Sequence, residues 1–251
     1  MTMLDNLVPR PDPARALANY RVLAAGYDGT CRYIAPLRQR AIDALMLTPG
    51  ESVLDIACGT GPTLPSLARA VGSAGRVIGV ELSPQMAALA KARLLAEGLS
   101  GSVHIVEAAV EAMPPLQPAD ALLLCYTHDV LQSPAALERL IACAKPGARI
   151  AILGMKTVPW LWGWPLNLFN MYRARRYMTT FSSLARPWQR LEQRGASLRQ
   201  VHTALWGSAY IVAGTLPNQT DAREAVSGQE PVARHCRQSR QPHLAIRRHS
   251  R

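Results

Sequence analysis

A short loop of small residues, Ala-Cys-Gly-Thr-Gly at positions 57–61, follows an apolar run and precedes a helical segment. Glycine adopts backbone conformations that other residues avoid, and small side chains let the backbone approach a ligand closely. The acidic Asp55 stands just before the loop. We therefore expect Asp55, Ala57, Gly59 and Gly61 to contribute to a ligand site.

The spacing of the glycines restricts which ligand this loop can hold. A dinucleotide fingerprint needs a third glycine three residues after Gly61, where helix and strand pack closely. Leu64 stands there instead and would crowd that contact. Asp55 would also repel a pyrophosphate. The loop therefore favours a ligand with a cationic group, such as an ammonium or a sulfonium.

A second acidic residue, Glu81, ends the apolar run 76–81. A carboxylate at the end of the second strand of such a fold can accept hydrogen bonds from both ribose hydroxyls. The alternative is a solvated charge at a strand end. Together with the glycine loop, Glu81 predicts a ligand that contains an adenosine-like part.

Polar residues also follow a later apolar run, in the stretch Tyr126-Thr127-His128-Asp129. Tyr126 and His128 are the candidate catalytic residues. His128 is the candidate general base, since the pKa of an imidazole lies near physiological pH. Alternatively, His128 hydrogen-bonds a lid or orients Asp129 and transfers no proton. Cys58 has no base at a recognisable spacing, so we interpret it as a small residue that fills the loop.

The elements that must position these residues alternate between strands and helices. Proline stands near the expected start of three helices, at Pro62, Ser83-Pro84 and Ser133-Pro134. Such alternation indicates a parallel sheet with right-handed crossovers. The sequence predicts a doubly wound, Rossmann-like α/β fold whose seven-stranded sheet is mostly parallel and ends in an antiparallel hairpin. The expected strands are 52–56, 76–81, 103–107, 121–126, 149–153, 199–205 and 208–213.

The organisation of the chain follows from this rhythm and from its breaks. The aromatic segment after the fifth strand is either core packing or a cap; with its tryptophans and arginines, a cap would suit an apolar or partly anionic small molecule. We expect a helical lid at 1–45, a ligand-binding core at 46–156, a helical, aromatic substrate cap at 157–198, a closing β-hairpin at 199–215 and a disordered basic tail at 216–251.

The composition bears on partners. The 251 residues carry a formal net charge of +11, which raises the odds of an anionic partner. The arginines gather at 173–199 and 234–251, away from the glycine loop. We interpret them mainly as solvated surface and tail, and expect no nucleic-acid partner.

The chain has five cysteines but no CxxC pair, which argues against a disulfide framework and a zinc site and suits a reducing cytoplasm. We expect no metal and a cytoplasmic location. The start of the chain lacks a signal-peptide core, and no apolar run is long enough for a transmembrane helix. The aromatic run 160–169 is interrupted by Pro165, so weak contact with a membrane surface is the most that it allows.

Three stretches carry a family resemblance: VLDIACGTG at 53–61, VIGVELSPQM at 77–86 and AKPGARIAILG at 144–154. They resemble the class I S-adenosylmethionine (SAM)-dependent methyltransferases, in the broad group that includes the ubiquinone and menaquinone biosynthesis enzymes. Tyr27-Asp28 is similar to an element that precedes the core in that group. The resemblance covers about residues 20–155 and the closing hairpin.

The resemblance implies SAM as the cofactor and assigns roles to residues. Asp55, Gly59 and Gly61 would hold its methionine and ribose end, with Ala57 at the position of the loop's first glycine, and Glu81 would bind the ribose hydroxyls. Leu82 would lie against the adenine, and Tyr27 would close over the ligand.

Adenine recognition departs from the family pattern. An acid that often contacts the adenine amino group is replaced by Ala109. That contact is left to the backbone of Val110 or to Glu111.

The resemblance implies methyl transfer to a small organic acceptor, with the sulfonium carbon near Asp55, Gly59 and Tyr126. Two alternatives stay open. One is an RNA methyltransferase, suggested by the basic balance, although the Asn/Asp-Pro-Pro-aromatic signature is missing after the fourth strand. The other is a SAM-binding module without catalysis. Whether O, N, C or S is methylated stays open, as does the oligomeric state.

Overall fold

The computed structural model describes residues 11–217, except for the side chains of Ala25, Thr30 and Cys31. The lead-in 1–10 and positions 218–251 of the predicted tail lie outside the described residues. The elements, in chain order, are α1 (Pro13–Leu23), η2 (Ala24–Gly26), α2 (Tyr27–Cys31), η3 (Arg32–Ile34), α3 (Ala35–Asp43), β1 (Ser52–Ile56), α4 (Leu64–Val71), β2 (Arg76–Glu81), α5 (Pro84–Ala96), β3 (Val103–Glu107), η4 (Val110–Ala112), β4 (Ala119–Cys125), α6 (His128–Gln132), α7 (Pro134–Ala142), β5 (Ala144–Met155), α8 (Trp160–Ala174), α9 (Gln189–Glu192), β6 (Ser197–Ala204) and β7 (Ala209–Thr215).

The strands form one seven-stranded sheet in the order β3-β2-β1-β4-β5-β7-β6. The first five are parallel, and β7 runs antiparallel to both β5 and β6. The strand order reverses between β1 and β4, which is where ligands bind in open α/β sheets, at the carboxyl ends of the strands. The predicted fold, with its antiparallel hairpin, is confirmed.

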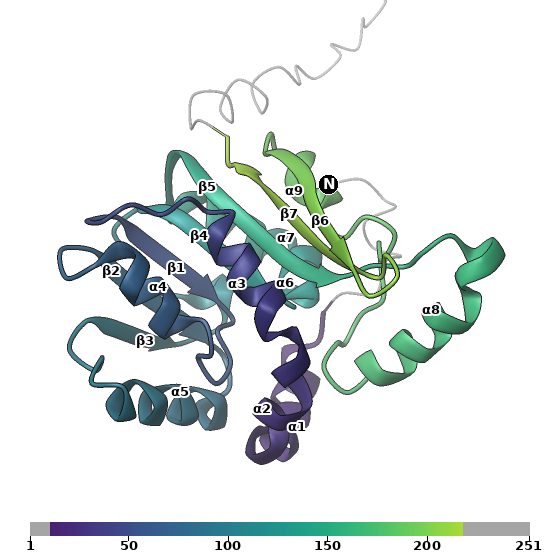
Figure 1. The fold of residues 1–251 in the computed structure, drawn as a ribbon, viewed down its shortest axis with the longest axis horizontal. Helices are drawn as coiled ribbons and strands as arrows, with labels where there is room; N and C mark the ends of the chain where they lie inside the picture. Colours follow the sequence, from purple (N-terminus) through teal and green to yellow (C-terminus); the bar gives the residue numbers. More distant parts are fainter. Residues whose placement is uncertain (1–10, 218–251) are drawn as a thin grey trace, which may run out of the picture.

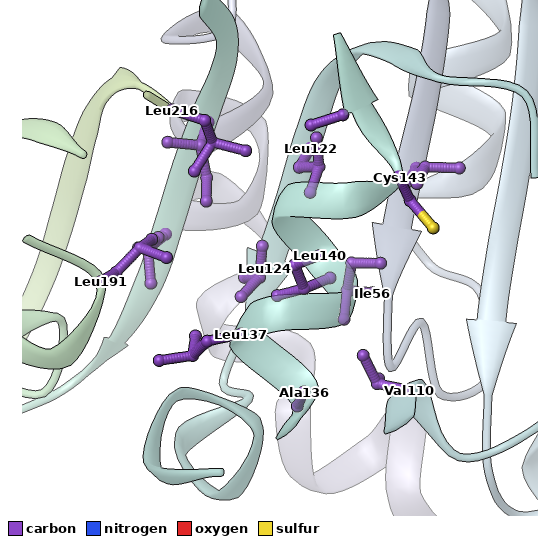
Figure 2. Close-up of a cluster of buried hydrophobic side chains, with 14 of the residues drawn as sticks. Ile56, Val110, Leu122, Leu124, Ala136, Leu137, Leu140, Cys143, Leu191 and Leu216 are labelled. Carbon is purple, nitrogen blue, oxygen red and sulfur yellow. The ribbon is translucent and has the colours of Figure 1, made fainter. Parts of the chain in front are cut away.

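Helices cover both faces of the sheet, so alternate residues of a central strand enter different cores (Figure 1). Leu123 of β4 packs with residues of α3, α4 and α5 on one face. Leu122 and Leu124 point to the other face, where Leu137 and Leu140 of α7 cover them (Figure 2). This two-sided burial explains why the central strands are almost entirely apolar.

Of the three helix starts predicted from proline, two are observed and one is not. Ser83 and Ser133 are N-caps, each accepting a hydrogen bond from the backbone N–H three residues on. Pro62, however, stays in the loop, because α4 begins at Leu64 and Pro65 takes the first-turn position. β5 is also longer than expected, starting at Ala144.

Candidate active site

The loop between β1 and α4 turns sharply through residues with positive φ. Ala57, Gly59 and Gly61 have φ values of 52°, 61° and 71°. A Cβ on Gly61 would lie 2.8 Å from Leu64 Cδ1 and 3.1 Å from the Ala90 Cβ, so this glycine lets the loop pack on α5. A Cβ on Gly59 would meet only the Tyr27 ring, at 4.0 Å. Gly59 therefore leaves open space over the loop, whereas Gly61 serves packing.

A cavity with an empty volume of about 990 Å³ opens at the carboxyl ends of β1, β2 and β4. Eight of the ten residues singled out from the sequence line it: Tyr27, Ala57, Gly59, Glu81, Leu82, Val110, Tyr126 and His128. Asp55 and Gly61 are not among its lining residues. We refer to this space as the cofactor cavity.

Glu81 joins the glycine loop to the next strand connection. Its Oε2 accepts a hydrogen bond from the Gly59 N–H at 2.8 Å, and its Oε1 accepts one from the Ser83 N–H at 2.7 Å. Burial raises the pKa of Glu81, and these backbone donors oppose that rise. Each carboxylate oxygen can accept a further hydrogen bond. The fixed carboxylate can thus receive two hydroxyl donors in the cavity.

Asp55 lies in a small recess beside the cofactor cavity, together with Arg38 and Thr63. Its side chain accepts a hydrogen bond from the Thr63 hydroxyl. Burial raises the pKa of Asp55 to about 7, although Thr63 and the nearby Arg38 act against this rise. The recess shares Tyr27, Ala57 and Gly59 with the cavity. Contact between Asp55 and a ligand stays a prediction.

The side of the cavity formed by the chain after β3 offers backbone groups. Ala109 and Val110 both line it. Glu111 also lines it, but its Oε1 accepts a hydrogen bond from the Ser133 hydroxyl at 2.6 Å. One oxygen of the Glu111 carboxylate is thus engaged by the N-cap of α7, and adenine recognition by the Val110 backbone or by Glu111 stays a prediction.

A second cavity, with an empty volume of about 970 Å³, adjoins the first. It reaches from Tyr126 and His128 to β5, β7 and α8, where Met155, Tyr210 and Arg173 line it. Its lining is mainly aromatic and apolar. We refer to it as the acceptor cavity. The two cavities share Tyr20, Tyr27, Tyr126, Thr127, His128, Tyr177 and Met178.

His128 stands between the two cavities without a hydrogen-bonding partner. Its side chain is buried, with 6% of the residue exposed. Among residues 11–217, neither imidazole nitrogen of His128 has a hydrogen-bond partner, and the Thr127 hydroxyl has none either. Burial lowers the pKa of His128, and the nearby Asp129 opposes that effect. The Ser182 backbone opposes it too, although its contact with the imidazole does not meet hydrogen-bond geometry. Because leaving buried polar groups unpaired is unfavourable, these atoms indicate a ligand contact.

Tyr126 precedes His128 in a strained conformation. Its φ is 59°, and its N–H donates to the Leu153 carbonyl at 2.7 Å. Positive φ is uncommon for a bulky residue and concentrates at functional sites. The turn directs the chain from β4 into α6, and both Tyr126 and His128 line the two cavities.

The N-terminal helices border one side of the site, where Tyr20 of α1 and Tyr27 of α2 line the cofactor cavity. Figure 1 shows α1 and α2 below α3. Asp28 of α2 accepts a hydrogen bond from the Thr60 hydroxyl at 2.5 Å and pairs with Arg93 of α5. This contact ties α2 to the glycine loop. The neighbouring Tyr27 lies in the cavity lining, edge-on to Tyr20 and Tyr177 with ring centroids 6.3 and 5.9 Å away.

The segment after α8 closes the site from the other side. Asp129 accepts hydrogen bonds from the Thr179 N–H and hydroxyl, at 2.9 and 2.7 Å, and from the Thr180 N–H. Asp129 therefore anchors this segment beside His128. Sequence reasoning missed the lining residues Tyr20, Tyr177 and Met178. The aromatic character of 157–198 was a signal for Tyr177, whereas Tyr20 and Met178 had none.

Cys58 is not placed for chemistry. It is buried, and burial raises the pKa of its thiol. A Cβ on Gly79 of β2 would lie 2.8 Å from the Cys58 sulfur, so the side chain fills the space beneath the loop. Within the described residues, no group of three or more His, Cys, Asp or Glu side chains is arranged to hold a metal ion.

Comparison with known proteins agrees with this geometry. Residues 53–147 match the family model of a methyltransferase domain. The chain is similar to the ubiquinone/menaquinone biosynthesis C-methyltransferase UbiE of Pseudomonas putida F1, with 29% identity over 154 residues, or 58% of this chain and 60% of that protein. UbiE of Ectopseudomonas mendocina is 34% identical over 107 residues, which are 42% of each chain. The match thus spans about three fifths or less of these relatives.

Solved structures share the fold. A SAM-dependent methyltransferase from Aquifex aeolicus superposes with a TM-score of 0.55 and 21% identity, over 82% of this chain and 98% of that one. The methyltransferase SibL gives a TM-score of 0.61 at 19% identity, over 85% and 65%. The [4+2]-cyclase SpnF gives 0.56 at 15% identity, over 84% and 98%.

The chain thus matches a methyltransferase-domain model over residues 53–147 and shares the fold of solved SAM-dependent methyltransferases. Among such domains, the chain resembles the UbiE C-methyltransferases. Family and fold imply S-adenosylmethionine as the cosubstrate.

Proposed function

We propose that the protein transfers a methyl group from SAM to a small organic acceptor that binds in the acceptor cavity. The observation that carries this proposal is the unpartnered, buried His128 at the junction of the two cavities. One cavity has a fixed carboxylate, that of Glu81, which can accept hydrogen bonds from the hydroxyls of an adenosine ligand. The other has an apolar, aromatic lining with Arg173 at its edge, which suits an apolar or partly anionic molecule.

SAM would supply an activated methyl group on a sulfonium. Glu81 would bind the ribose hydroxyls, Gly59 would leave room for the ligand, and Tyr27 would cover it. The attacking atom of the acceptor bonds to the methyl carbon while the carbon–sulfur bond breaks and its electron pair stays on sulfur. An acceptor that loses a proton in this step needs a base. His128, neutral because burial lowers its pKa, is placed to take that proton.

The names of the UbiE relatives favour a carbon acceptor. The RNA methyltransferase alternative receives no support from the site, because the acceptor cavity has a mainly apolar lining. The non-catalytic alternative deserves a direct test, since the fold also occurs in a protein described as a [4+2]-cyclase.

The test is incubation of the purified chain with SAM labelled in its methyl group and an extract of small molecules. We expect label to move into a low-molecular-weight product, with one S-adenosylhomocysteine formed for each methyl transferred. If calorimetry shows that the protein binds SAM, but no label is transferred with extracts prepared under several growth conditions, the non-catalytic module is supported instead.

Asp55 provides a prediction that needs no acceptor. Its pKa of about 7 in the ligand-free protein leaves it largely protonated near pH 6. A cationic ammonium bound nearby would favour the carboxylate, so the pKa should fall and a proton should be released. Calorimetry in buffers of different ionisation enthalpy should show up to one proton released per SAM near pH 6 and almost none at pH 9, where Asp55 is already ionised.

The control for this prediction is Asp55→Asn. Glu81 and His128 can also exchange protons when a cation binds, but this substitution leaves both in place. Proton release near pH 6 should largely disappear in Asp55→Asn. Equal release in the wild type and the variant would place the ammonium away from Asp55.

A further inference from the structure

The helix α8 has the reverse of the usual amphipathic pattern. Its buried residues are small or polar: Gly163, Asn167 and Ala174. Its large apolar residues are exposed and form a surface that we call the α8 apolar face: Trp160, Leu161, Trp162, Trp164, Leu168, Phe169 and Tyr172. Leu161 is 94% exposed. An exposed apolar patch of this kind marks an interaction site.

Two contacts fix the rotation of α8 and therefore keep this face outward. The Asn167 side chain is buried and bonds the Val158 backbone twice, accepting from its N–H and donating to its carbonyl, both at 2.9 Å. A Cβ on Gly163 would lie 2.1 Å from Val158 Cγ2, so only glycine fits there. Figure 1 shows α8 extending away from the sheet, on the side of β6 and β7. No rotation could bury the tryptophans without breaking these contacts.

Along the sequence, the charges on α8 and on the segment just after it are all basic. From position 156 to 191 the chain has no acidic residue and six basic ones: Lys156, Arg173, Arg175, Arg176, Arg186 and Arg190. At the end of the helix, the Arg173 and Arg175 guanidinium groups lie 5.8 and 4.0 Å from the ring centres of Phe169 and Tyr172. Aromatic side chains and arginines thus form one continuous surface.

We propose that the α8 apolar face docks the protein on the surface of a membrane with anionic headgroups. Tryptophan prefers the membrane–water interface, and a helix with Trp, Leu and Phe flanked by arginine lies in that interface. A helix of 15 residues, about 22 Å long, is too short to span the hydrocarbon core. Within residues 11–217, no helix is long and apolar enough to cross a bilayer.

A second copy of the chain fits this surface less well. Two copies joined through α8 would bring the arginine-rich ends of both helices together, and α8 itself carries no acidic residue to offset the repulsion. Anionic lipids supply the missing negative charge. Docking does not depend on methyl transfer, although Asn170, Arg173 and Ala174 of α8 also line the acceptor cavity, whose rim would then lie close to the lipid surface.

The test is sedimentation of the full chain with vesicles of phosphatidylcholine, with and without 30% phosphatidylglycerol. We expect at least fivefold more bound protein on the anionic vesicles. Leu161→Glu should reduce this binding at least fivefold, because it places a charge in the apolar contact. Leu95→Glu is the matched control: Leu95 is 73% exposed on α5, so this substitution should leave binding unchanged.

Several outcomes decide the proposal. Both variants should keep the wild-type melting temperature, since both leucines are exposed. Absence of binding to anionic vesicles by the wild type would overturn it. Binding that Leu161→Glu leaves intact would also overturn it, because the basic residues at 234–251 alone would then account for attachment. A stable dimer dissolved by Leu161→Glu, without vesicle binding, would assign the face to a second copy.

Discussion

Replacing Glu81 by alanine is expected to weaken SAM binding by about 100-fold or more. The carboxylate is held by the Gly59 and Ser83 N–H groups and can accept two ribose hydroxyls. A hydrogen bond to a charged group contributes about 1.5–3 kcal/mol, and 1.4 kcal/mol corresponds to a tenfold change in affinity. Two such bonds therefore give about two orders of magnitude, measurable by titration calorimetry with SAM or S-adenosylhomocysteine.

The neighbouring strand provides a matched control. Glu107 ends β3 directly opposite Glu81 in the strand register, but it is more exposed, pairs with Lys91 and does not line the cofactor cavity. Glu107→Ala should leave SAM affinity within about threefold of the wild type. Melting temperatures would show that both variants are folded.

A ligand without the ribose hydroxyls separates direct contact from an indirect effect on the loop. A 2′,3′-dideoxy analogue of S-adenosylhomocysteine should bind wild type and Glu81→Ala almost equally, because it has no ribose hydroxyls through which Glu81 could strengthen binding. If Glu81→Ala weakened the analogue as much as the parent ligand, Glu81 would act only by shaping the Gly59 loop.

The central sheet could be predicted closely because burial and topology impose a simple pattern. β1, β2 and β3 begin and end at the residues expected, since each is a short apolar run bounded by turn residues. The start of β5 could not be predicted in this way. Lys145-Pro146-Gly147 is typical of a helix end, yet Ala144 already pairs with Ala119 of β4, a pairing between distant segments that local preferences do not reveal.

The candidate site likewise contains residues that could be predicted from the sequence and residues that could not. Glu81 ends β2, and Tyr126 and His128 come just after β4, so the parallel topology alone brings them to one edge of the sheet. Tyr20 and Met178 reach the cavity from α1 and from the segment after α8, whose positions depend on tertiary contacts such as those of Asp129 with Thr179. The exposure of the α8 apolar face could not be predicted from the sequence either. The rotation of α8 is fixed by Gly163 and Asn167, and a hydrophobic pattern does not register such contacts.

Replacing His128 by asparagine is expected to lower kcat about 100-fold or more, with KM little changed, for an acceptor that must lose a proton. General base catalysis contributes about 10²–10⁴-fold. Burial lowers the pKa of His128, so the neutral, active form persists below the usual midpoint of about 6.5. The wild-type rate should therefore rise with pH to a plateau, with the midpoint of the rise below 6.5. In His128→Asn, this acidic limb should disappear.

The pH profile separates this role from simple packing. A histidine that only shaped the cavity would change KM or stability, and its loss would leave the pH dependence of kcat in place. His104→Asn is the control, because His104 is an exposed histidine on β3 outside both cavities, and it should retain wild-type rates. Activity of His128→Asn within fivefold of the wild type, with the acidic limb preserved, would mean that methyl transfer here depends on proximity alone. In that case the unpaired imidazole would serve to bind the acceptor rather than to take its proton.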